Sequence, residues 1–118
     1  MKQIHKKNNT DNIVKLVASK LEELKATDIK VFDLKEKSLL FDNAIIATGS
    51  SSRHVVTIAD KLADLLKQEC DTFSKSEGYQ VGEWILIDAG NVAINIFQEE
   101  ARNRYKLEEI WNNNEPQG

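Results

Sequence analysis

The sequence is poor in the residues that support several common protein classes. Among its 118 residues there is one cysteine, Cys70, and one proline. A single cysteine excludes an internal disulfide framework and a multi-cysteine zinc module. Uninterrupted apolar runs do not exceed four residues, as at 44–47 and 84–87, whereas a membrane-spanning helix needs roughly 20. Residues 1–10 lack the apolar stretch of a secretory signal and the arginines of a transit peptide, so we expect a cytoplasmic protein.

Charge is moderate overall but unevenly distributed along the chain. The net charge of −3 argues against a protein that coats RNA, because such a protein needs a basic surface to release counterions. Residues 1–40 carry nine lysines against six acidic residues, whereas residues 41–118 carry seven basic residues against thirteen acidic ones. The acidic C-terminal part is compatible with a basic partner, although an ordinary solvated surface explains the same balance.

The length fits one domain, which we place at residues 10–111, with flexible segments at 1–9 and 112–118. Within it, stretches with the helical apolar period alternate with strand-like stretches. The pattern predicts helices from Thr10/Asp11, after Gly49–Ser52 and over 98–111, and strands at 28–34, 41–48, 84–88, 92–97 and, more weakly, within 71–77. The lysine in 28–34 predicts an edge strand, and the aliphatic centre of 41–48 predicts a strand buried on both faces. This order indicates an α/β domain in which helices pack on a sheet.

The last two strands predict a hairpin with the two-residue turn Gly90-Asn91. This register pairs Trp84 with Phe97, Ile85 with Ile96, Leu86 with Asn95, and Ile87 with Ile94. One face is then entirely aliphatic, and the other combines Trp84, Leu86, Asp88, Ala93, Asn95 and Phe97. A three-residue loop would shift the register by one and place Asn95 among isoleucines. The mixed face fits a contact surface, or equally a face under a helix whose polar groups are hydrogen-bonded.

The segment 47–54, between a strand and a helix, is the strongest candidate for chemistry. Backbone N–H groups at such a junction can bind phosphate, but neither GxGxxG nor GxxxxGK[ST] is present. A nucleotidyltransferase needs paired carboxylates for Mg²⁺ shortly after Gly49-Ser50, and the sequence has none there. The serines at 50–52 are better explained as helix caps than as nucleophiles activated by His54.

The remaining candidates do not form a catalytic or metal site. Cys70 has no neighbouring histidine that would make it a reactive thiolate. His5 and His54 are too few for a metal site, and Asp60 and Asp64 share a helix face with lysines. We therefore predict no enzyme activity, no cofactor and no metal.

Several segments, taken in order, carry a resemblance to a known family: 42–55 (DNAIIATGSSSRHV), 58–60 (IAD), 77–78 (EG), Trp84, 88–90 (DAG), 98–102 (QEEAR) and 105–111 (YKLEEIW). Together they resemble the ribosomal silencing factor family, also called the Iojap family, over about residues 13 to 111. The resemblance implies an α/β domain with a small mixed sheet, distantly similar to the nucleotidyltransferase fold without its catalytic carboxylates. Two residues depart from the family pattern. Asn91 replaces the usual Asp, although it suits a left-handed turn position equally well, and Asn95 replaces a frequent His.

The resemblance also implies a function that requires no chemistry. Family members bind the large ribosomal subunit through ribosomal protein L-fourteen, which sterically blocks subunit joining and lowers translation when nutrients are scarce. They are commonly homodimers when free. We expect neither a membrane partner nor sequence-specific nucleic-acid binding. The predicted apolar centre of the contact is Trp84, Leu86 and Phe97, with Asn95 beside them. The acidic residues Asp88 and Asp42 are predicted to meet basic residues of the partner. Arg53 and His54 are weaker candidates, which could instead position the strand-to-helix loop.

Two alternatives from other classes remain. The first is a phosphate- or nucleotide-handling enzyme that uses the Gly49-Ser50 loop. The second is a simple dimeric interaction module whose mixed hairpin face is its self-association surface. Binding to large ribosomal subunits at physiological salt would separate a silencing factor from both.

Overall fold

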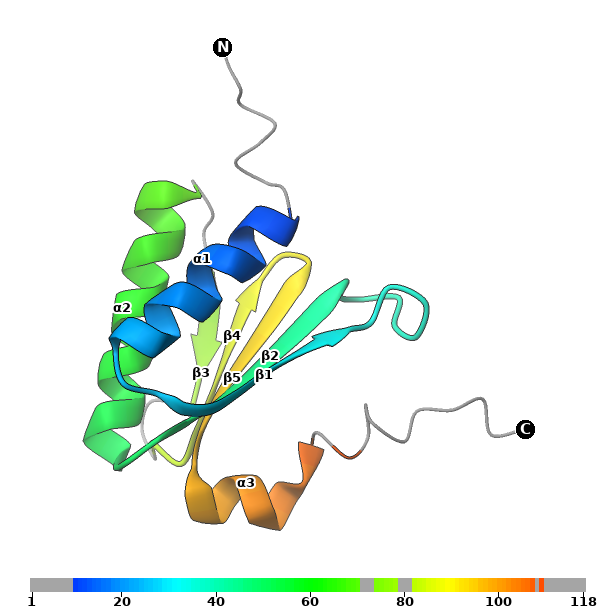
Figure 1. The fold of residues 1–118 in the computed structure, drawn as a ribbon. Helices are drawn as coiled ribbons and strands as arrows, with labels where there is room; N and C mark the ends of the chain where they lie inside the picture. Colours follow the sequence, from blue (N-terminus) through cyan, green and yellow to red (C-terminus); the bar gives the residue numbers. More distant parts are fainter. Residues whose placement is uncertain (1–9, 71–73, 79–81, 108, 110–118) are drawn as a thin grey trace.

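The computed structural model describes residues 10–70, 74–78, 82–107 and 109. In this range the chain forms three helices and five strands (Figure 1). These are α1 (Thr10–Glu23), β1 (Thr27–Asp33), β2 (Asn43–Gly49), α2 (Ser52–Glu69), β3 (Lys75–Glu77), β4 (Trp84–Ala89), β5 (Val92–Gln98) and α3 (Glu99–Tyr105). The predicted order of elements is confirmed, and the weakly predicted strand within 71–77 is β3. The predictions for segments 1–9 and 112–118 lie outside the described residues.

The five strands form one mixed sheet in the order β1-β2-β5-β4-β3. β2 and β5 are parallel, and the other neighbouring pairs are antiparallel. β1 is an edge strand, and every residue of β2 is buried, so both predictions for these strands are confirmed. The aliphatic sequence of β2 follows from its central position, where both faces of the strand are covered.

The two faces of the sheet are covered differently. α1 and α2 pack side by side on one face, where their apolar stripes meet the aliphatic face of the β4–β5 hairpin (Figure 1). α3 lies on the other face, where Ala101 joins a smaller cluster with Ile46 and Phe97. Among the described residues, no helix is long and apolar enough to cross a membrane.

The hairpin register predicted from the sequence is confirmed at all four pairs. Ala89 pairs with Val92, which leaves Gly90 and Asn91 as the two-residue turn. Gly90 has a φ of 77°, whereas Asn91 is not among the non-glycine residues with positive φ. Asn91 would tolerate a left-handed conformation but does not adopt one here. The turn has its positive φ at the first central residue, which glycine supplies without a steric cost.

The helix predicted over 98–111 is interrupted at Lys106, and Leu107 and Glu109 are again helical. α3 ends at Tyr105, and Lys106 adopts a left-handed conformation with a φ of 52°. The N–H of Lys106 still donates to the carbonyl of Arg102, at 3.0 Å. The following Leu107 packs against the Ile46–Phe97 cluster, so the turn at Lys106 accompanies a tertiary contact that helical periodicity does not encode. The rest of the predicted helix, at 108 and 110–111, lies outside the described residues.

Candidate functional site

The mixed face of the β4–β5 hairpin reaches the surface mainly through β4. Trp84, Leu86 and Asp88 are partly exposed and alternate with buried residues that face α1 and α2. On β5, the opposing residues Asn95 and Phe97 are only 2% and 0% exposed. We call Trp84, Leu86 and Asp88 the hairpin surface.

The ring of Trp84 is held in place by two other predicted contact residues, Asn95 and Phe97. Its indole Nε1–H donates to Oδ1 of Asn95 at 2.9 Å. Its ring stacks on that of Phe97, with centroids 4.9 Å apart and planes inclined by 24°. Asn95 and Phe97 therefore support Trp84 rather than present their own surface. An amide oxygen at position 95 accepts this bond without any titratable group, so the replacement of a histidine here leaves the tryptophan anchored.

Tyr105 belongs to the same site, although sequence reasoning did not select it. Its ring centroid lies 5.0 Å from that of Trp84 and 6.5 Å from that of Phe97, and the residue is 50% exposed. The guanidinium carbon of Arg104 is 5.3 Å from the Tyr105 centroid, and Arg104 also pairs with Glu83. The available signal was the four-residue spacing from Ala101 to Tyr105, which places both on one helix face. We call Trp84, Phe97 and Tyr105 the aromatic cluster.

The two acidic residues predicted for the contact lie near the hairpin turn. Asp88 accepts a hydrogen bond from the N–H of Gly90 at 3.1 Å and stands opposite Lys75 in the sheet register. The backbone N–H of Asp42 donates to the carbonyl of Asn91 at 2.7 Å. The structure thus brings Asp42 beside the turn that follows Asp88, at the end of β4 away from Trp84.

His54 has an internal role that explains its position. The N–H of Ser50 donates to Nδ1 at 2.8 Å, so the ring hydrogen resides on Nε2, which lies 2.9 Å from the carbonyl oxygen of Leu24. The imidazole therefore joins the strand-to-helix loop to the connection after α1. Arg53 beside it is exposed. Of the two functions considered for His54, its contacts favour positioning the loop.

Replacing His54 with alanine should lower the free energy of unfolding by about 1–2 kcal/mol, because a local hydrogen bond from Ser50 and a long-range one to Leu24 are lost. Arg53→Ala is the matched control, and a change within about 0.5 kcal/mol is expected for such an exposed residue. Urea denaturation followed by circular dichroism measures both. Equal stabilities of the two variants would show that the imidazole contacts contribute nothing.

Two backbone N–H groups of the same loop are already hydrogen-bonded to side chains of this chain. The N–H of Ser50 is committed to His54, and the N–H of His54 donates to Oγ of Ser51 at 3.0 Å, which makes Ser51 the helix cap. The capping interpretation of the serines is confirmed for Ser51. In the described part of the chain, no three His, Cys, Asp or Glu side chains gather as they would around a metal ion. Burial, with a smaller contribution from Glu69, raises the pKa of the buried Cys70 thiol, which opposes thiolate formation.

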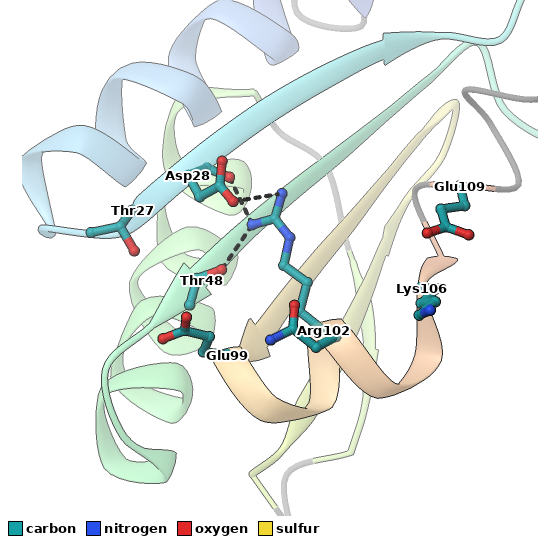
Figure 2. Close-up of a pocket in the computed structure, with 8 residues that line it drawn as sticks. Thr27, Asp28, Thr48, Glu99, Arg102, Lys106 and Glu109 are labelled. Atoms are coloured by element: carbon teal, nitrogen blue, oxygen red, sulfur yellow. Dashed lines mark hydrogen bonds and ion pairs between the residues drawn. The ribbon is translucent and has the colours of Figure 1, made fainter.

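A polar cavity of about 620 Å³ lies between β1 and α3 (Figure 2). Its lining residues are Thr27, Asp28, Thr48, Glu99, Arg102, Asn103, Lys106 and Glu109. None of the residues predicted for the site is among them. Its size is typical of small-molecule sites, but its lining lacks the apolar side chains that dominate such pockets. Its most distinctive member is Arg102, which is only 6% exposed and appeared in the sequence only as part of the segment 98–102.

Comparison with known proteins identifies the family. The family described as "Ribosomal silencing factor during starvation" matches residues 7–118. The chain belongs to this family. The protein named "Ribosomal silencing factor RsfS" from Haemophilus influenzae is 41% identical over 100 residues, which cover 84% of this chain and 97% of that protein. A crystal structure of a protein from Chromobacterium violaceum matches with a TM-score of 0.83 at 33% identity, over 92% of this chain and 90% of the other.

A more distant relative carries a different name. The mouse protein "Mitochondrial assembly of ribosomal large subunit protein 1" is 29% identical over 101 residues, which cover 83% of this chain and 44% of that protein. The resemblance found from sequence segments is confirmed, and so is the expected mixed α/β fold. A ribosomal silencing factor acts in ribosome-associated regulation of translation, and the family is a regulatory one rather than a family of enzymes.

Proposed function

We propose that this silencing factor binds the large ribosomal subunit through ribosomal protein L-fourteen, blocks joining of the small subunit and represses translation under nutrient limitation. The family description and the name of the mouse relative support a large-subunit partner. The observation that carries the proposal is that Trp84 is partly exposed while its ring is hydrogen-bonded to Asn95 and stacked on Phe97.

Aromatic residues fixed before binding are effective anchors in protein interfaces. Tryptophan and tyrosine are enriched among the residues that dominate binding energy. Because Trp84 is already hydrogen-bonded and stacked, little side-chain freedom remains to be lost when a partner covers it. With Leu86 and the half-exposed Tyr105 beside it, Trp84 forms the apolar centre of the proposed contact.

Acidic residues near the hairpin turn supply the polar part of the proposed contact. Asp88 and Asp42 would face lysines and arginines of a basic ribosomal protein. Charges at such a rim contribute more to orientation and association rate than to affinity. We assign Asp88 the larger role, because it lies on the same strand face as Trp84 and Leu86.

A homodimer of the free protein is part of the proposal. Apolar side chains outside the hairpin surface support it: Val31 on the edge strand is 46% exposed, and Leu39 and Leu40 in the following loop are 105% and 76% exposed. An edge strand with exposed apolar neighbours is a common place for chain association. Sedimentation velocity of the free protein tests the oligomeric state.

Co-sedimentation with isolated large subunits, followed by addition of small subunits, tests the proposed function. We expect the protein to pellet with large subunits at physiological salt and to reduce the yield of joined ribosomes as its concentration rises. The salt dependence should be shallower than that of an RNA binder, because the partner is a protein. Protein that stays in the supernatant, or pellets without affecting subunit joining, would contradict the proposal.

A further inference from the structure

Arg102 is a buried cation on a very short helix. α3 has seven residues, fewer than an isolated helix needs to be stable in water, so tertiary contacts must hold it. Arg102 is 6% exposed, and its Nη1 donates to the backbone carbonyl of Asp28 at 2.7 Å and to Oγ1 of Thr48 at 2.8 Å. Its Nη2 lies 3.5 Å from the Asp28 carboxylate. Figure 2 shows the guanidinium reaching from α3 to both strands.

The strand that receives Arg102 is irregular at that point. The pairing of β1 with β2 shifts between Thr27 and Lys30, and Asp28 has a φ of 50°. A non-glycine residue in this left-handed region is strained and persists only where surrounding contacts hold it. The hydrogen bond from Arg102 to the Asp28 carbonyl is such a contact, so the arginine stabilises the conformation of the bulge.

The position of α3 determines the position of Tyr105. Tyr105 lies three residues after Arg102, within one helical turn, and its ring contacts Trp84 of the hairpin surface. We propose that Arg102 is a positioning residue that holds α3 on the β1 bulge and so fixes Tyr105 against Trp84 in the partner-binding surface. The expected effect of Arg102 on partner binding rests on the proposed function. The expected effect of Arg102 on the position of Tyr105 in the aromatic cluster does not.

The test uses Arg102→Met in full-length protein, because methionine keeps an apolar stem similar to that of arginine but has no hydrogen-bond donors. In a Trp111→Phe background Trp84 is the sole tryptophan, and acrylamide quenching of its fluorescence reports on its cover by Tyr105. We expect quenching to rise about twofold and the affinity for large subunits to fall about tenfold, which equals ~1.4 kcal/mol. Thr48→Val removes one acceptor of the arginine and should shift both readouts in the same direction by less. If Arg102→Met does not fold, the same two measurements are made on Thr48→Val alone.

Two comparisons separate positioning from a general loss of stability. Ile58→Val trims the core on the α1–α2 side of the sheet and should lower stability while leaving quenching and binding unchanged. In a Tyr105→Ala background, Arg102→Met should weaken binding no further, because the residue through which it acts is gone. Wild-type quenching in both Arg102→Met and Thr48→Val, or a full additional loss of binding in the Tyr105→Ala background, would overturn the inference. If wild-type protein does not bind large subunits, the proposed function fails, and quenching still decides whether Arg102 positions Tyr105.

Discussion

Trp84→Ala is expected to weaken binding to isolated large subunits by about thirtyfold or more, as truncation of an interface anchor costs ~2 kcal/mol or more. The variant removes the partly exposed indole and leaves Phe97 and Asn95 without the ring that covers them. Binding is measured by co-sedimentation over a range of protein concentrations, and circular dichroism establishes that the variant is folded.

Trp84→Phe is the informative companion variant. It keeps a ring that can stack on Phe97 but cannot donate to Asn95. An affinity between those of wild type and Trp84→Ala would show that both the ring area and its hydrogen-bonded orientation contribute. If Trp84→Ala is folded and binds as tightly as wild type, Trp84 is not the anchor. The exposed pair Leu39 and Leu40 would then be the next surface to examine.

The geometry around Trp84 could be predicted from the sequence because a strand period of two leaves little freedom. One hairpin register produces a face that is entirely aliphatic, and a shift of one residue would bury Asn95 among isoleucines. Once that register is accepted, the proximity of Trp84 to Phe97 follows directly. The register does not determine how deeply each side chain is buried. It places Asn95 on the mixed face but does not show that the residue is only 2% exposed.

The contacts that sequence reasoning missed join residues far apart in the chain. Arg102 and Asp28 are separated by 74 positions, and their contact depends on a strand bulge and a left-handed residue that local propensity does not indicate. The bond between His54 and the Leu24 carbonyl likewise depends on how α1 packs beside α2. Such contacts arise from the packing of complete elements, which neither spacing nor composition specifies.

Gly78→Ala is expected to lower the free energy of unfolding by about 3 kcal/mol or more, through backbone strain combined with a steric clash. Gly78 has a φ of 104°, and a Cβ atom added there would overlap the carbonyl oxygen of Trp84. That oxygen is backbone, so it cannot rotate away as the end of a side chain could. Urea denaturation of the variant measures the loss.

Gly90→Ala is the matched control for Gly78→Ala. Gly90 has a similar positive φ of 77°, but nothing lies within 4 Å of an added Cβ. Only backbone strain remains, and it should cost about 1–2 kcal/mol. Equal losses in the two variants would show that the contact with Trp84 has no energetic consequence.

The clash at position 78 also reaches the proposed binding surface. An alanine there must displace the backbone of Trp84, the residue whose ring forms the proposed anchor. Gly78→Ala should therefore weaken large-subunit binding even where the variant is fully folded, whereas Gly90→Ala, which lies beside Asp88 at the far end of the hairpin, should weaken it less. A Cβ at position 78 does not fit beside the backbone carbonyl of Trp84, so glycine at 78 lets the chain pass close to the strand that carries the proposed anchor.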